Sequence, residues 1–140
     1  MRLLFASQGS YDTHKQQAGT HPNLLTELSS ALAAFQKDRE GHQVADRVVV
    51  LVFSEFGRRV DENGSQGTDH GAASCLFLAG SQVQGALHGS YPSLEKLGEG
   101  DLIHTVDFRA VYAALLDGWL GCSAERLLGG KFAPLPLLAT

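Results

Sequence analysis

The residues of this chain that could do chemistry are aspartates and histidines placed close together in glycine-rich segments. Asp69 and His70 stand side by side between glycines in "NGSQGTDHGAA" (63–73), and Asp12 is followed by His14 in "YDTH". Carboxylate oxygens and imidazole nitrogens together suit divalent ions such as zinc or manganese. Glycines beside the Asp-His pair would let neighbouring side chains turn toward one ion. The same pair also fits an ordinary turn, so its surroundings must decide.

Two further histidines and one arginine extend this set. His21 precedes a proline at the expected start of a helix, and His104 lies in "LIHTVDFR" shortly before another expected helix. Arg58, in "SEFGR", could clamp an anionic oxygen, although a solvated loop arginine is the plain alternative. His42 and His88 have no acidic neighbour in register, so we interpret both as surface residues.

The elements that must position these residues alternate between strand and helix. "RLLFAS" (2–7) is a short apolar run typical of a buried strand. Residues 21–40 carry apolar side chains at helical spacing, with Pro22 suited to the first turn and Gly41 to the exit. "RVVVLVF" (47–53) has the β-branched, non-alternating composition of a central strand. Together they predict a right-handed βαβ unit.

The second half of the chain continues this pattern less regularly. Residues 54–71 predict a long polar, glycine-rich loop, 73–80 a further strand, and 106–121 an amphipathic helix. In an open parallel sheet, ligands bind beyond the carboxyl ends of the strands. The segments after the first two predicted strands would therefore bring their aspartates and histidines to one rim. Without repeats or a low-complexity linker, residues 1–140 predict a single α/β domain.

Composition excludes several classes of partner. The 140 residues are 44% hydrophobic with a net charge of −4, and they contain no run of lysine or arginine that would bind nucleic acid or an anionic membrane. No apolar segment approaches the roughly 20 residues that span a bilayer. Cys75 and Cys122 form no metal or disulfide motif, so we expect both to pack as small apolar groups.

Four motifs taken together resemble one protein family. "DTH", "SEFGR", "GTDHG" and "HTVDFR" occur in collinear order over nearly the whole chain. In this order they are similar to the C-terminal part of the bacterial domain-of-unknown-function family 1501 (DUF1501), which is sulfatase-like and belongs to the alkaline phosphatase-like superfamily. The resemblance implies a three-layer α/β/α fold with a mostly parallel sheet, of which this chain is the C-terminal half.

The resemblance also implies a two-metal site for phosphoryl or sulfuryl transfer. One ion would be held by Asp12, by either His14 or His21, and by His104. The second ion would take Asp69 and His70, together with an aspartate and a Ser/Thr nucleophile from the N-terminal half of the family's domain, which lies outside this sequence. Each ion would stabilise one oxygen of an in-line displacement. Because relatives often carry an export signal, the resemblance would also imply a periplasmic parent, whereas "MRLLFAS" and the residues after it do not predict a signal peptide.

The sequence does not decide whether this chain alone is an active enzyme. We expect a small anionic ester as substrate in the full-length parent, weak or no activity in this chain alone, and self-association through an unpaired strand edge. "CSAER" (122–126) lacks the proline of the sulfatase cysteine motif and is rejected as a nucleophile. Two alternatives remain: a non-catalytic module that binds an anion or a partner, and a purely structural role for the histidines and aspartates in capping helices and turns.

Overall fold

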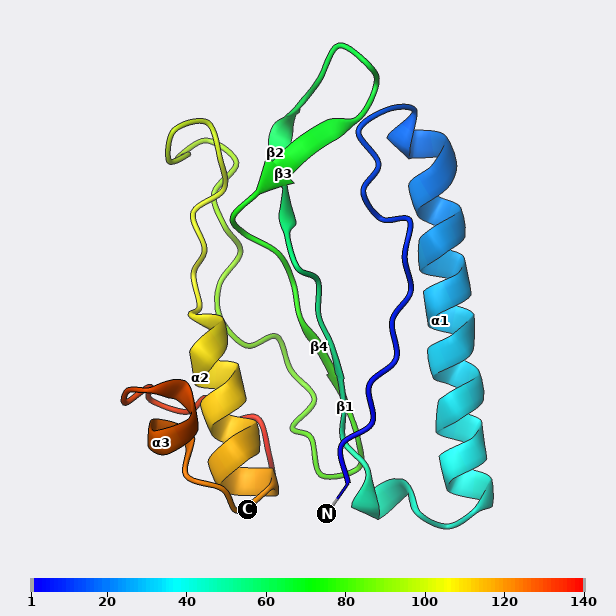
Figure 1. Cartoon of the computed structure of the whole chain (residues 1–140), viewed down its shortest axis with the longest axis vertical. Coiled ribbons are helices and arrows are strands. Elements are labelled where there is room, and N and C mark those ends of the chain that lie inside the picture. Colours follow the sequence, from blue (N-terminus) through cyan, green and yellow to red (C-terminus); the bar gives the residue numbers. More distant parts are fainter. Residues whose placement is uncertain (1, 140) are drawn as a thin grey trace.

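The computed structural model describes residues 2–139 and has a mixed α/β architecture (Figure 1). Its regular elements are two long helical units, two short helices and four short strands. In chain order they are α1 (Gln17–Gly41), η1 (Ala45–Arg47), β1 (Val50–Val52), β2 (Gly57–Glu62), β3 (Thr68–Gly71), β4 (Phe77–Ala79), α2 (Phe108–Ala113), η2 (Ala114–Trp119) and α3 (Ala124–Leu128). η2 is a π-helical continuation of α2. Among the described residues, no helix is both long and apolar enough to cross a membrane.

The strands form two separate antiparallel pairs, which corrects the expected mostly parallel sheet. β1 pairs with β4, with Leu51 opposite Leu78, and β2 pairs with β3, with Arg58 opposite His70. The second pair lies where a loop was expected. Asn63 closes its turn, because its Oδ1 accepts hydrogen bonds from the amides of Ser65 (3.0 Å) and Gly67 (3.1 Å). The polar run 54–71 therefore builds a hairpin.

Residues 2–7 are extended but pair with no strand in the described chain, so the predicted strand and its βαβ unit are wrong here. Leu3, Leu4 and Phe5 are 77%, 92% and 82% exposed. An apolar run forms a stable strand only when a neighbouring edge and a covering layer bury it. The end of this segment is tied to α1 instead, since the Tyr11 hydroxyl donates to the Leu24 carbonyl at 3.1 Å.

The two predicted long helices are confirmed, with shifted boundaries. α1 begins at Gln17 rather than at residue 21, because the β2–β3 turn accepts its first amides: Gln16 donates to Ser65 at 3.0 Å and Gln17 to Gln66 at 2.9 Å. α2 and η2 cover most of 106–121. Asp107 caps α2 by accepting from the Arg109 amide at 2.9 Å, and this hydrogen-bonded arginine lowers the Asp107 pKa to about 2.

The core lies where α2 and η2 cover the β1–β4 pair (Figure 1). Val111, Ala114 and Leu137 are buried there, and four partly buried leucines pack against them: Leu51, Leu76, Leu78 and Leu135. Leu137 belongs to the C-terminal tail, which lies against the body. α1 contributes little to this core, because Arg39 is its one buried residue.

The chain leaves an unusually large surface open. Its accessible surface is 10077 Å² for 15.0 kDa, whereas a folded monomer of this mass exposes about 7,000 Å². The excess of about 3,000 Å² on this one chain is as large as or larger than the roughly 1,000–2,500 Å² that each partner usually buries in an obligate interface. Residues 3–9 carry no charge that would oppose pairing with a second copy of the same segment.

We therefore expect the isolated chain to self-associate through residues 3–5. Leu4→Glu and Phe5→Lys should shift the chain toward monomer in sedimentation velocity, because a charge on this segment opposes its burial. Leu94→Glu is the matched control, since Leu94 is 70% exposed and lies outside the segment. A wild-type chain that sediments as a monomer at about 100 μM would contradict this expectation, because apolar surface of this size drives association well below that concentration.

Candidate metal centre

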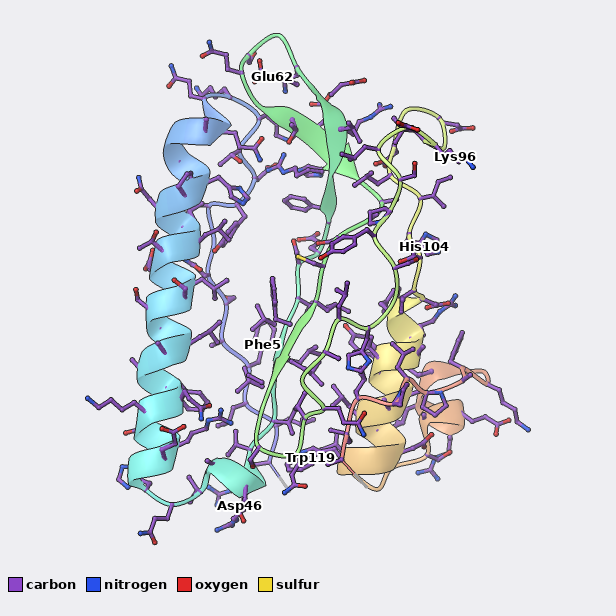
Figure 2. The ribbon with its side chains drawn as sticks, turned by 180° about the vertical axis from the view of Figure 1, so that it is seen from behind. Phe5, Asp46, Glu62, Lys96, His104 and Trp119 are labelled. Atoms are coloured by element: carbon purple, nitrogen blue, oxygen red, sulfur yellow. The ribbon has the colours of Figure 1, made fainter. Side chains whose placement is uncertain are left out.

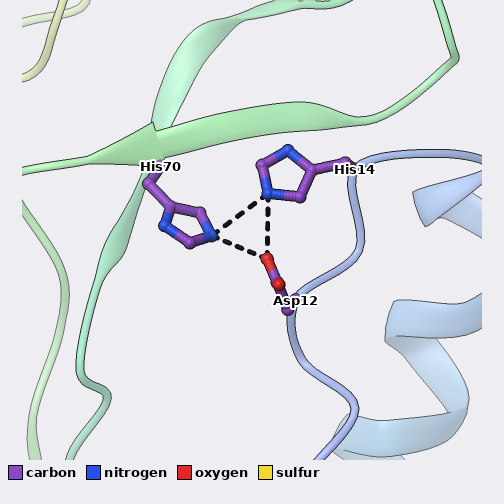
Figure 3. A group of neighbouring side chains, drawn as sticks. All are labelled: Asp12, His14 and His70. Carbon is purple, nitrogen blue, oxygen red and sulfur yellow. Dashed lines mark hydrogen bonds and ion pairs between the residues drawn. The ribbon is translucent and has the colours of Figure 1, made fainter.

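Asp12, His14 and His70 meet at one point on the surface (Figure 3). The Asp12 Oδ1 atom lies 2.9 Å from His14 Nε2 and 2.7 Å from His70 Nε2, and the two Nε2 atoms are 3.2 Å apart. Asp12 and His14 come from the segment before α1, whereas His70 comes from β3. Two imidazole nitrogens and one carboxylate oxygen thus converge from parts of the chain that lie far apart in sequence.

The dimensions of this triangle fit a divalent ion. Ligand atoms about 2.1 Å from a common ion are separated by about 3.0 Å in octahedral and about 3.4 Å in tetrahedral geometry. The three separations in the structure, 2.7, 2.9 and 3.2 Å, lie around the octahedral value and below the tetrahedral one. An ion held here would take these three atoms as part of its set of ligands. Its other coordination positions would face solvent, because all three side chains are exposed.

Gly67 permits the approach that brings these ligands together. A Cβ atom at this buried position would clash with the backbone of His14 and lie 2.7 Å from the Lys15 amide nitrogen. Asn63 Nδ2 donates to the His14 carbonyl at 3.0 Å, so the turn also holds the ligand segment directly. Asn63 was not singled out from sequence, although an asparagine followed by glycine is a recognisable turn signal, and Gly67 was noted only as one of the glycines around Asp69 and His70.

Arg58 also holds the segment before α1 against the β2–β3 hairpin. Its Nη1 donates to the Thr68 carbonyl at 2.6 Å, and its Nη2 donates to the Tyr11 carbonyl and to the Thr13 hydroxyl. Thr13, between the two ligands, is buried as a result. Both terminal nitrogens of the guanidinium therefore bind protein oxygens. The anion-binding role expected for Arg58 stays a prediction.

Phe56 orients His70. The two rings are stacked, with centroids 3.8 Å apart and planes 9° from parallel, and the Arg58 guanidinium lies 5.0 Å from the Phe56 ring centre. This stack leaves the His70 Nε2 atom directed at Asp12. No pattern in the sequence pointed to Phe56, because its role depends on the strand pairing.

Asp69 lies beside His14 rather than within the triangle. Its Oδ1 atom is 3.2 Å from His14 Nδ1 and 3.4 Å from Asn63 Nδ2. The hydrogen bond from Asn63 and then that from His14 lower the Asp69 pKa, and the hydrogen bond from His70 is the main cause of the lowered Asp12 pKa. Both carboxyl groups therefore stay ionised to a lower pH than an ordinary aspartate does.

Two of the predicted ligands lie outside this cluster. His21 sits on α1 with its ring 5.9 Å from that of Tyr11, and its Nδ1 atom is buried without a hydrogen-bond partner in the described chain. His104 lies on the segment that leads into α2 (Figure 2). The structure thus brings together Asp12, His14 and His70, with Asp69 adjacent, and the ligand roles of His21 and His104 stay predictions.

Most of the chain matches the model of one protein family. The family model described as "Protein of unknown function (DUF1501)" matches residues 1–127. The chain belongs to the DUF1501 family. No curated protein and no solved structure matches it. The motifs that carry the cluster of this DUF1501 chain all lie within the matched residues.

Gly67→Ala tests whether the close approach of the turn creates the site. The added methyl group must push the His14 backbone away, and we expect the affinity for zinc to fall at least tenfold while the far-UV circular dichroism stays unchanged. Gly64→Ala is the matched control, because a Cβ atom there meets nothing within 4 Å. Equal zinc affinities of the two variants, measured by competition with a chromogenic chelator, would contradict this assignment.

Proposed function

We propose that this DUF1501 chain binds a divalent metal ion through Asp12, His14 and His70, as part of a phosphatase- or sulfatase-like metallohydrolase. The observation that carries the proposal is the convergence of two Nε2 atoms and one carboxylate oxygen within 3.2 Å of one another. Hydrogen bonds within an ordinary turn would not need two imidazoles aimed at the same oxygen. Zinc and manganese are the ions that this donor set favours.

The exposure of the site favours a substrate that arrives from solvent. Asp12 is 66% exposed and the two histidines 45% each, so a bound ion would keep open positions for an anionic oxygen. Such an ion polarises a phosphoryl or sulfuryl oxygen and stabilises charge that develops on it. A small phosphate or sulfate ester is therefore the substrate class of the proposal. Asp12 stays ionised at neutral pH, which suits it to hold the ion.

The alkaline phosphatase-like architecture belongs to the same proposal. The accessible surface of 10077 Å² and the exposed residues Leu3, Leu4 and Phe5 favour a further protein layer over the extended segment. Such a layer would convert the extended residues 2–7 into a paired strand beside the rest of a larger sheet. In the two-metal arrangement that the family resemblance implies, it would also add ligands for a second ion.

The proposal predicts metal-dependent ester hydrolysis by this chain. With one equivalent of zinc or manganese, we expect slow turnover of an aryl phosphate or aryl sulfate, and we expect Asp12→Asn to lower the rate at least a hundredfold because it removes a ligand charge.

His42→Ala is the control for this assay, because His42 is exposed on the other end of α1 and makes no contact with the cluster. It should leave the rate unchanged. Turnover that is equal in wild-type chain, Asp12→Asn and chelator-treated protein would refute a metallohydrolase. Stoichiometric metal binding without turnover of either ester would instead support a non-catalytic module.

A further inference from the structure

Asp69 and His70 are adjacent in sequence but approach His14 from different sides. Both belong to β3, and successive side chains of a strand point to opposite faces. His70 lies 3.2 Å from the Nε2 atom of His14, whereas Asp69 lies 3.2 Å from its Nδ1 atom. The imidazole of His14 is therefore held between a partner at each ring nitrogen.

We propose that Asp69 is a positioning residue that acts through His14 and is not itself a metal ligand; this inference rests on the proposed metal site. A metal-binding histidine uses one ring nitrogen for the ion and donates its other N–H to a carboxylate or carbonyl. With Nδ1–H donated to Asp69 Oδ1, the lone pair of His14 Nε2 is directed at the triangle. The family resemblance, by contrast, assigned Asp69 to the ligands of a second ion.

Asn63 fixes Asp69 in this role. Its Nδ2 group donates to Asp69 Oδ1 at 3.4 Å and to the His14 carbonyl at 3.0 Å. Its Oδ1 atom accepts from the amides of Ser65 and Gly67. A closed set of hydrogen bonds thus runs from His14 to Asp69, on to Asn63 and back to the His14 backbone. The turn of the hairpin sets the position of Asp69, and Asp69 sets the rotation of the His14 ring.

Cobalt binding separates a positioning residue from a ligand. We expect Asp69→Ala to weaken the affinity for Co²⁺ by about 10- to 100-fold, the range for carboxylates that support a metal-bound histidine. The intensity and position of the visible Co²⁺ bands should stay unchanged, because the set of ligands is the same. Asp12→Ala should lower the affinity further and alter the bands. Asp69→Asn, which keeps an acceptor for the Nδ1–H, should restore part of the affinity.

Two further readouts keep the test decisive. Asp69 is 61% exposed, so its variants should fold, and far-UV circular dichroism checks that they do. In the zinc-loaded chain, the ¹⁵N shifts of the His14 ring should show a protonated Nδ1 that exchanges faster with solvent in Asp69→Ala.

The possible failures are distinguishable. An unchanged Co²⁺ affinity of Asp69→Ala would overturn the positioning role and leave the metal site intact. Altered Co²⁺ bands in that variant would show Asp69 to be a ligand and would overturn it as well. A wild-type chain that binds no Co²⁺ would refute the metal site and this inference together.

Discussion

Arg58 and the turn at Gly67 hold the segment before α1 against the β2–β3 hairpin, and the candidate site exists because of this contact. Arg58 donates to Tyr11 and Thr13, the two neighbours of Asp12 in the chain, and Asn63 donates to the His14 carbonyl. The ligand segment is irregular, so its own backbone bonds do not fix it. Its position depends on a hairpin that begins more than 40 residues later, and the first amides of α1 depend on the same turn.

Two carboxylates, those of Asp12 and Asp69, lie beside the imidazole of His14, and they determine the charge of the cluster. Hydrogen bonds from His70 to Asp12 and from Asn63 to Asp69 lower the pKa of each carboxyl group. A carboxyl group whose pKa is lower in the folded than in the unfolded chain stabilises the fold above its unfolded pKa. That contribution is lost as the pH falls through the folded value. Because both groups are exposed, their main importance lies in the negative charge that they hold ready for a cation.

The sequence predicted the structure best where the structure depends on residues that are close together in the chain. The helical spacing of residues 21–40 and 106–121 predicted both long helices, because that periodicity needs only one covered face. The meeting of the segments that carry Asp12, His14 and His70 was also expected, although a hairpin rather than a parallel sheet rim produces it, and the family resemblance had assigned His70 to a second ion. Pairing of strands is non-local, and this is where prediction failed: residues 2–7 stay unpaired, and the polar run 54–71 forms strands.

The supporting residues of the site were the least predictable. Phe56 and Asn63 are neither metal-ligand nor catalytic residue types, so no motif selects them. They support the site because the pairing of β2 and β3 places Phe56 beside His70 and Asn63 beside Asp69. His21 shows the opposite difficulty. It follows Asp12 in a plausible ligand pattern, yet α1 places it against the ring of Tyr11. Proximity in sequence therefore predicted a type of chemistry, and the strand register selected which side chains meet.

The most direct test of the metal centre is X-ray absorption at the zinc edge, on the chain loaded with one equivalent of zinc and then desalted. We predict a retained ion whose nearest shell contains two imidazole nitrogens and a carboxylate oxygen at about 2.0–2.1 Å. Loss of the zinc on desalting, or a shell made only of water oxygens, would contradict a metal centre at Asp12, His14 and His70.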